Sequence, residues 1–587
     1  MLIAMKKIEW MRLAGLLGIL VLAAVLRSHL TSSGLPGVVL PRHDEAHYVP
    51  TVVQFLQGQW EIGYFVNPTL YMYLLYAVTA LTGLFLVVVG RYPSWDGFVT
   101  DVTLDTGLVT MVGRSLTLTA GLASVVLVYC IGRRMFSPRV GLIAALALAL
   151  DRTHVERSTL AGNEVVLVLL LLIFFLVLLR YVERPSVRLH VSCGILLGLA
   201  MSTKYSGAIH LPTLAAGSLC AAIAVRPGRS LIRQLIRPRY WVGFPCALLA
   251  FVLASPWVLL AHDKFLKDFA RQAAFLHEGF SFADKQANEY GWITYIREFP
   301  FGNLGLFFAV LCALGIGAAI WRTIRQRNSN CALLLAACLP AYLYLGSGIF
   351  ADMRFLLVAI PFVLILGAWA LDGIAAISIR GYDRIRKRTG GEWRDAVLVT
   401  SLLLLLVPHA RGLDRDLNRR FKRDIRAELL VWMREALNPE DIYLDLYLGE
   451  QRFFAIEPMA AWLRVEKVGS AVVQREFVEL RERYLTSQDI VALLRHSDGF
   501  EEFCAALEQH AAKRLIVISP LPSGSRGTHR QLLRQALNKV PRYGRYRSRS
   551  RSKDCWKEMI EFLAGLEIEA VKGARDRRTW VWILKLP

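Results

Sequence analysis

Long uninterrupted apolar runs constrain the fold of this chain more than any other feature of its sequence. Val165–Leu179 and Phe355–Leu371 are each long enough to cross, or nearly cross, the hydrocarbon core of a bilayer, which is roughly 30 Å thick. Hydrophobic residues make up 55% of the 587 positions, and the mean hydropathy of +0.41 is too high for an ordinary soluble protein of this size. We therefore predict a mostly α-helical, multi-pass membrane protein.

Apolar segments recur from the N-terminus to about residue 410 and define the membrane part of the chain. They lie near residues 10–29, 68–89, 107–131, 139–156, 163–181, 190–209, 211–225, 241–261, 303–321, 331–347, 355–376 and 395–409. Several are short or adjoin one another, so we predict about 11 to 13 transmembrane helices. Because so many spans follow the first, we interpret the N-terminus as an uncleaved signal anchor.

The formal net charge of +22 is compatible with nucleic-acid binding, but its distribution indicates a membrane orientation instead. Basic residues gather in short loops between apolar runs, at Arg133-Arg134, Arg226–Arg239, Arg322–Arg327 and Arg380–Arg394. Such loops are typically cytoplasmic and face anionic lipid. We therefore expect the membrane as a partner and no nucleic acid. The nine cysteines contain no CxxC pair, so neither a structural zinc site nor a redox motif is supported.

If the basic loops lie in the cytoplasm, the remaining loops can be assigned to one side of the membrane. The predicted outer segments are a first loop at 30–67, then 152–162, the junction near 205–211, a loop at 262–302, and 348–354. One conflict of parity remains, because three full crossings after an inside N-terminus would place 152–162 inside. Either Asn67–Val89 does not cross fully, or the loop that carries Arg133 is an exception to the charge rule.

The chain changes character after the transmembrane domain, which we assign to residues 1–410. Residues 411–587 alternate charged helical segments with short β-like runs, a pattern that predicts a small α/β domain, here expected outside the cytoplasm. The predicted helices are Phe421–Ala436, Gln488–Arg495 and Glu501–Ala512, and the predicted strands are Ile442–Leu448, Arg514–Ser519 and Thr579–Leu584.

The outer loop at 262–302 contains an amphipathic, aromatic stretch at Phe269–Phe282. This pattern is typical of a helix that lies along a membrane surface. His277 in this stretch is a candidate substrate-binding residue. Alternatively, it lies at the membrane interface without a role in binding.

The cluster His43-Asp44-Glu45-Ala46-His47-Tyr48 follows the first span directly. A carboxylate that faces water at the mouth of a membrane domain can act as a general base toward a hydroxyl, or can ligate a metal. The alternative for Asp44 and Glu45 is a solvated acid that caps the following helix. His43 and His47 are candidate metal ligands, so a divalent metal cofactor is one option, and Tyr48 is a candidate substrate contact.

Other ionisable residues lie at the predicted outer ends of later helices. Arg157 and Glu164 could line a polar cavity with Asp44, or could pair with each other for structural reasons. Lys204, followed by Tyr205, ends an apolar run, and an anionic group such as a lipid phosphate is its natural functional partner.

Arg354 begins a helix on the predicted outer face, against the charge rule. A guanidinium suits bidentate binding of phosphate, and the alternative is a structural pair with the neighbouring Asp352.

Together these residues resemble the type-C glycosyltransferases, specifically the protein O-mannosyltransferase and aminoarabinose-transferase superfamily. The likeness covers roughly residues 10–410 and rests on motifs in the expected order. These motifs are Asp44-Glu45, Asn67-Pro68-Thr69-Leu70-Tyr71, Gly132–Phe136, Glu156-Arg157-Ser158, Gly198–Tyr205 and Arg354–Pro361. Two positions depart from the family pattern: Thr69 replaces the second proline, and Asn163-Glu164 stands where relatives often carry an aspartate.

The resemblance implies an enzyme of the bacterial plasma membrane that uses a polyprenyl-phosphate-linked sugar and has its active site on the extracytoplasmic face. It implies that Asp44 accepts the proton of an acceptor hydroxyl as the hydroxyl oxygen attacks the anomeric carbon. Lys204 and Arg354 would then stabilise the departing lipid phosphate. The sugar and the acceptor (protein, lipid or glycan) stay open at this point.

Two other functional classes compete with the enzyme. A lipid or solute transporter, including a flippase, also places Lys and Arg in a membrane cavity, but transporters usually carry internal repeats, and we detect none in the sequence. A membrane scaffold that recruits partners through its C-terminal part would leave Asp44 and Lys204 without a purpose. The enzyme is the preferred interpretation.

Overall fold

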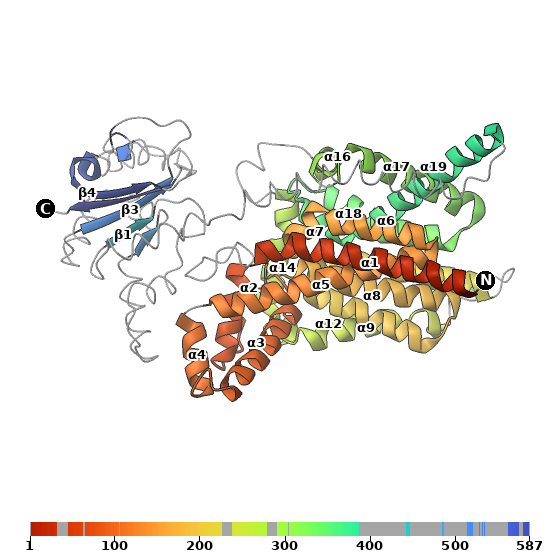
Figure 1. Ribbon diagram of the computed structural model, residues 1–587. Helices are drawn as coiled ribbons and strands as arrows, with labels where there is room; N and C mark the ends of the chain where they lie inside the picture. The colour runs from red at the N-terminus through yellow and green to blue at the C-terminus, as the bar shows by residue number, and fades with distance from the viewer. Residues whose placement is uncertain are drawn as a thin grey trace. The chain divides into compact units, whose positions relative to one another are not determined.

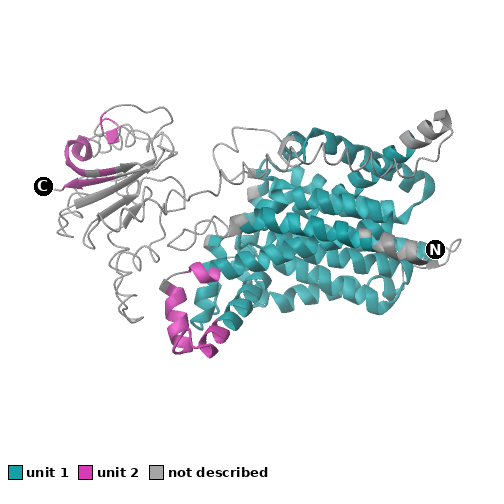
Figure 2. Cartoon of the chain, in the orientation of Figure 1, with its two compact units in different colours: residues 1–31, 43–82, 110–420 teal, residues 32–42, 83–109, 421–587 magenta. Residues whose placement is uncertain are grey.

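The structure of the chain is a computed structural model. The structure describes residues 2–31, 45–62, 65–104, 106–225, 237–278, 290–302 and 304–386, and in the C-terminal part 442–445, 484–486, 514–520, 528, 531, 533–534, 561–573 and 579–585. The chain forms two compact units, residues 1–31, 43–82 and 110–420 in the first and residues 32–42, 83–109 and 421–587 in the second (Figure 2).

The first unit is a bundle of helices (Figure 1). Its long helices are α1 (Leu2–Thr31), α3 (Leu70–Val88, whose last residues belong to the second unit), α5 (Gly107–Met135), α6 (Pro138–Leu150), α8 (Glu164–Glu183), α9 (Val187–Thr203), α10 (Leu211–Val225), α12 (Gly243–Ala254), α17 (Leu306–Gln326), α18 (Ser329–Gly346) and α19 (Ile360–Arg386). Shorter or peripheral helices are α2 (Glu45–Leu56), α7 (Arg152–Arg157), η1 (Tyr205–His210), η2 (Pro238–Tyr240), α13 (Trp257–Leu260), α14 (His262–Glu278), α16 (Gly291–Gly302) and η3 (Met353–Val358).

Seven helical segments within the described residues are long and apolar enough to cross a membrane. They are Leu70–Val88, Gly107–Met135, Glu164–Glu183, Tyr205–Ala224, Leu306–Gln326, Ser329–Gly346 and Ile360–Ile377, and α6, α9 and α12 are shorter apolar helices. The prediction of a mostly helical multi-pass membrane protein is therefore confirmed. The predicted span at 395–409 lies outside the described residues.

The bundle has two distinct ends, which α5 connects. Near its start, Arg114 bonds to Glu45, and near its finish, Arg134 bonds to Glu183 at 2.5 Å. We call these the Glu45 end and the Arg134 end. Arg133 and Arg134, in the last turn of α5, therefore lie at the end opposite to Glu45, as the charge rule predicts.

The direction of α3 accounts for the conflict of parity in the sequence. The Tyr71 hydroxyl lies 3.5 Å from Thr117 Oγ1, and a Cβ added to Gly113 would lie 3.3 Å from Leu75. As α3 advances from residue 71 to 75, it therefore passes α5 from residue 117 back to 113, toward the Glu45 end. Although α3 qualifies as a span by length and composition, it does not run through the bundle toward the Arg134 end.

The segment predicted as one span at 139–156 is divided at Asp151. This residue ends α6, and its Oδ1 accepts a 2.8 Å hydrogen bond from the backbone N–H of His154 as the N-cap of α7. The carboxylate therefore starts a new helix in a different direction, because it satisfies a backbone donor that α6 cannot reach.

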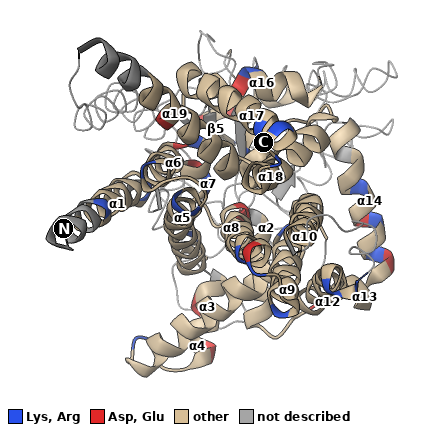
Figure 3. Ribbon diagram, turned by 90° about the vertical axis from the view of Figure 1, so that its right-hand side faces the viewer, with Lys and Arg blue, Asp and Glu red and all other residues tan. Residues whose placement is uncertain are grey.

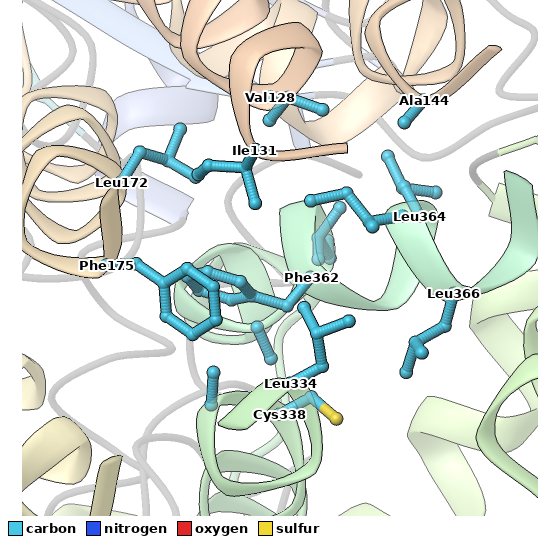
Figure 4. Packing of buried hydrophobic residues seen from close by; sticks show 14 of the residues in the cluster. Val128, Ile131, Ala144, Leu172, Phe175, Leu334, Cys338, Phe362, Leu364 and Leu366 are labelled. Atoms are coloured by element: carbon cyan, nitrogen blue, oxygen red, sulfur yellow. The ribbon is translucent and has the colours of Figure 1, made fainter. Parts of the chain in front are cut away.

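The interior of the bundle is packed with apolar side chains from α5, α6, α8, α18 and α19 (Figure 4). Phe175 of α8 meets Phe362 of α19 with ring centroids 4.8 Å apart. Close packing of α9 on α12 depends on glycine, since a Cβ at Gly194 or Gly198 would overlap the backbone of α12. This Gly-x-x-x-Gly spacing is the small-residue pattern that lets membrane helices approach closely.

In the predicted outer loop at 262–302, the described residues are mainly helical. The amphipathic helix begins earlier than the predicted Phe269: α14 runs from His262 to Glu278 (Figure 3). The backbone N–H of Phe65 donates a 3.0 Å hydrogen bond to the buried Asp268 of α14. This bond ties α14 to the chain segment that leads into α3.

The second unit contains α4 (Trp95–Leu104) and a five-stranded sheet in the order β2-β1-β3-β5-β4. Its strands are β1 (Ile442–Asp445), β2 (Tyr484–Thr486), β3 (Arg514–Pro520), β4 (Glu567–Gly573) and β5 (Thr579–Lys585). The first three are parallel to one another, and β5 is antiparallel to both β3 and β4. The predicted strands at 442, 514 and 579 are confirmed, and the predicted helices at 421–436, 488–495 and 501–512 lie outside the described residues.

Candidate functional site

Glu45, the first residue of α2, is completely buried at one end of the bundle. Its Oε1 and Oε2 accept hydrogen bonds of 2.7 and 2.9 Å from Arg114, and Oε1 also accepts one of 2.9 Å from the backbone N–H of Ala161. Glu45 therefore joins the start of α2 to α5 and to the loop between α7 and α8. Asp44 and His43, the other candidate residues of this loop, lie outside the described residues.

A second group of charges surrounds Glu164, the first residue of α8. Lys204, which ends α9, donates a 2.8 Å hydrogen bond from Nζ to Glu164 Oε1. The charges of Arg157 and Arg354 also act on this carboxylate. Three of the predicted phosphate-binding or cavity-lining cations thus come together around one acid, although they lie on three different elements.

Within this group of charges, Arg354 is also paired with Asp352, two positions before it in the chain. Its Nε lies 3.1 Å from Asp352 Oδ2, and Asp352 Oδ1 accepts a 2.9 Å hydrogen bond from the Arg354 backbone N–H at the start of η3. The cationic groups of Lys204 and Arg354 lie 5.6 and 5.1 Å from the ring centroid of Phe355. The ring of Phe355 is therefore near both cations.

Asn163 connects the loops on which this group is built. Its Nδ2 donates to Asn67 Oδ1 at 3.1 Å and to the carbonyl oxygen of Thr203 at 2.7 Å. Asn163 is 1% exposed, and its Oδ1 has no hydrogen-bond partner within the described part of the chain. The amide thus fixes the approach to α3, the end of α9 and the start of α8 relative to one another.

The Tyr71 hydroxyl is close enough to both charged groups to be affected by each of them. It is fully buried, and the charges of both Glu45 and Glu164 act on it. Tyr48 is buried too and packs edge-to-face on Tyr71, with ring centroids 4.8 Å apart. Glu45 and the later cations are therefore parts of one polar region at the Glu45 end.

Tyr205 follows Lys204 and borders this region on the side of α14. Its hydroxyl donates a 3.3 Å hydrogen bond to the carbonyl oxygen of Phe65, and its ring contacts Phe265 and Phe269. His277, near the end of α14, is exposed, and none of its described contacts joins it to Glu164 or Lys204. The structure thus brings Tyr205 to the region and gives no such support for His277.

A metal site is not formed by the described residues. Among them, no group of three or more His, Cys, Asp or Glu side chains could hold a metal ion. His47 lies beside Tyr48, with ring centroids 5.3 Å apart, and the prediction that His43 and His47 ligate a metal stays untested. We therefore derive no chemical step through a metal.

Several residues of the region were not predicted from the sequence. Arg114 is the most informative, because an arginine inside the apolar run at 107–131 is rare in membrane helices and usually has a buried partner. The same argument applies to Arg27 in α1, whose Nη2 lies 3.0 Å from Nδ1 of the buried His154. Asn163 and Tyr71 carried no such signal, since polar residues near helix ends are common.

The fold of the chain is similar to that of known proteins. A family model for dolichyl-phosphate-mannose-protein mannosyltransferase matches residues 102–259 of the chain. The resemblance to the protein O-mannosyltransferase and aminoarabinose-transferase superfamily is thereby confirmed. A sequence search of the curated proteins finds no match.

Two solved structures illustrate the shared fold. ArnT from Cupriavidus metallidurans bound to undecaprenyl phosphate is 16% identical, with a TM-score of 0.52 over 98% of both chains. The apo oligosaccharyltransferase of Archaeoglobus fulgidus is 14% identical, with a TM-score of 0.51 over 92% of this chain and 73% of that chain. At these identities the likeness establishes the fold, and substrates have to be argued from the site itself.

Proposed function

We propose that the protein is a membrane glycosyltransferase that moves a sugar from a polyprenyl-phosphate-linked donor to an acceptor hydroxyl on the extracytoplasmic face. The observation that carries the proposal is the meeting of Lys204, Arg157 and Arg354 around Glu164. Three cations outnumber the two acids paired with them, Glu164 and Asp352, and a lipid phosphate is a further anion that a membrane can supply there.

The reaction assigns a distinct task to each part of the region. The acceptor oxygen attacks the anomeric carbon, the bond from that carbon to the phosphate oxygen breaks, and the polyprenyl phosphate leaves with the bonding electrons. Asp44 accepts the acceptor proton, a role that rests on its place in the sequence motif. Lys204 and Arg354 stabilise the charge that grows on the leaving phosphate.

Glu45 is better suited to a structural role than to the role of a second general base. Both of its oxygens are already engaged by Arg114 and the backbone of Ala161, in a site without solvent exposure. Oxygens held in this way are not placed to approach an acceptor hydroxyl. Glu45 would instead position the start of α2, directly after Asp44 in the chain.

The names of similar structures support the donor class. ArnT was solved with undecaprenyl phosphate, and the archaeal oligosaccharyltransferase was solved with an inhibitory peptide and a dolichol-phosphate. For this chain we propose a polyprenyl phosphate as the leaving group and a protein, lipid or glycan as the acceptor. We also propose a bacterial plasma membrane location, with residues 411–587 outside the cytoplasm.

The deciding experiment supplies the purified protein with a panel of polyprenyl-phosphate sugars and candidate acceptors. Release of the polyprenyl phosphate, together with glycosylation of an acceptor, is the expected result. The transporter alternative would instead move the lipid or solute across a proteoliposome membrane without any release of lipid phosphate. That outcome would overturn the proposed enzyme activity.

A further inference from the structure

We propose that Glu164 is a built-in counter-anion that occupies the phosphate-binding cations when no lipid phosphate is bound, and that it limits how tightly the product phosphate is held. The inference rests on the proposed function and assigns Glu164 a task within it. A donor phosphate would draw Lys204 away from Glu164, and the carboxylate would then repel the phosphate left after transfer.

The contacts of Glu164 support this exchange. Its carboxylate is 5% exposed and lies 2.8 Å from the Lys204 ammonium, whose side chain is 18% exposed. Lys204 is thus the more accessible partner, and an ammonium carries three donors, so it can turn toward an arriving anion while its stem stays in place. The positive charges of Arg157 and Arg354 act on the same carboxylate.

The position of Glu164 in α8 adds a second, independent source of attraction for anions. It is the first residue of a 20-residue helix, where free backbone N–H groups and the helix dipole favour negative charge. Asn163, just before it, is hydrogen-bonded to Asn67 and to the carbonyl of Thr203, which keeps this helix start in place. A phosphate near Lys204 would experience the same field that now stabilises the carboxylate.

The charge of the ligand explains why a competing carboxylate is useful. A lipid-linked sugar phosphate is a diester with one negative charge, whereas the released monoester carries about −1.5 to −2 at neutral pH. Three cations without Glu164 would therefore hold the product more tightly than the donor, and product release would become slow. The repulsion from Glu164 grows with the ligand charge, so it weakens product binding more than donor binding.

The test compares Glu164→Gln with the parent protein in detergent, with a polyprenyl monophosphate as the probe and the uncharged polyprenol of equal length as the reference. We expect the variant to bind the monophosphate about tenfold more tightly, an effect equivalent to about 1.4 kcal/mol, and to bind the polyprenol unchanged. In steady-state assays, inhibition by the monophosphate should strengthen by a similar factor, while the first turnover is affected less.

A matched control replaces an ion-paired glutamate at the opposite end of the bundle. Glu183→Gln removes the partner of Arg134, and it should leave binding of the monophosphate unchanged. If Glu164→Gln does not fold, Glu164→Asp shortens the side chain and should shift the affinity in the same direction by a smaller factor.

Weaker or unchanged binding of the monophosphate by the Glu164 variants would overturn the counter-anion and leave Glu164 as a residue that only orients Lys204. A failure of the proposed function looks different. In that case the parent protein and Lys204→Ala would bind the monophosphate no better than the polyprenol, which means that no phosphate site exists.

Discussion

Arg114 and Glu45, which are 69 positions apart, form a buried bidentate ion pair that joins α5 to the start of α2. Removal of one partner leaves an uncompensated buried charge, so we expect Arg114→Met or Glu45→Gln alone to lower the free energy of unfolding by about 3–5 kcal/mol. The double variant should be less destabilised than the sum of the two. Thermal and denaturant unfolding in detergent measure this, and additive losses would show that the two side chains do not act as a pair.

Asp44→Asn should abolish sugar transfer, with a loss of at least about 100-fold, because the amide cannot accept the acceptor proton. The abundance and thermal stability of the variant should match those of the parent protein. Asp263→Asn, on an exposed residue of α14, is the matched control and should retain transfer. Near-normal turnover by Asp44→Asn would remove this residue from the mechanism.

Lys204→Glu and Arg354→Glu should each raise the apparent KM for the donor by about tenfold or more, because each replaces an attraction for phosphate with a repulsion. Lys267→Glu makes the same change of charge on the exposed face of α14 and should leave the donor KM unaltered. Donor kinetics that do not respond to either site variant would contradict their assignment to phosphate binding.

His154 makes the stability of the protein sensitive to acid. Burial, and then the charge of Arg27, hold the pKa of this imidazole well below its usual value. Below pH about 6.5 the unfolded chain takes up a proton that the folded protein does not, so stability should fall as the pH decreases, by at most about 1.4 kcal/mol per pH unit from this group.

His154→Asn tests this assignment, because its side-chain oxygen can still accept the hydrogen bond that Arg27 Nη2 makes with Nδ1. Melting temperatures of the two proteins should converge as the pH falls from about 7 to about 5. An equal dependence on pH in both proteins would show that other groups dominate the acid limb.

The direction of α3 predicts which loops are accessible from outside the cell. Single cysteines placed at Gly90 and at Arg184, in a background without the native cysteines, should be labelled from opposite sides by an impermeant reagent. A reporter fused after residue 410 should report an extracytoplasmic position. Labelling of Gly90 from the cytoplasm would mean that α3 crosses the membrane after all.

Much of the architecture follows from local chemistry. Apolar runs such as Val165–Leu179 predict membrane helices because of their length and composition, and the basic loops predict the orientation of these helices. The strand runs near 442, 514 and 579 show their pattern within a few residues and are found in the sheet. Lys204 and Arg354 could be recognised as candidates because a cation at a helix end on the predicted outer face is exceptional.

The partners of these residues depended on contacts between distant parts of the chain. The bond from Arg114 to Glu45 and the packing of α3 toward the start of α5 arise only when the helices pack, and no local pattern encodes a neighbour 69 residues away. For the same reason, the sequence left open whether α3 crosses the membrane, and only its contacts at Gly113 and Thr117 show that it runs toward the Glu45 end. The packing of the helices also places Glu164 beside Lys204, so Asp352 is not the only acid near Lys204 and Arg354.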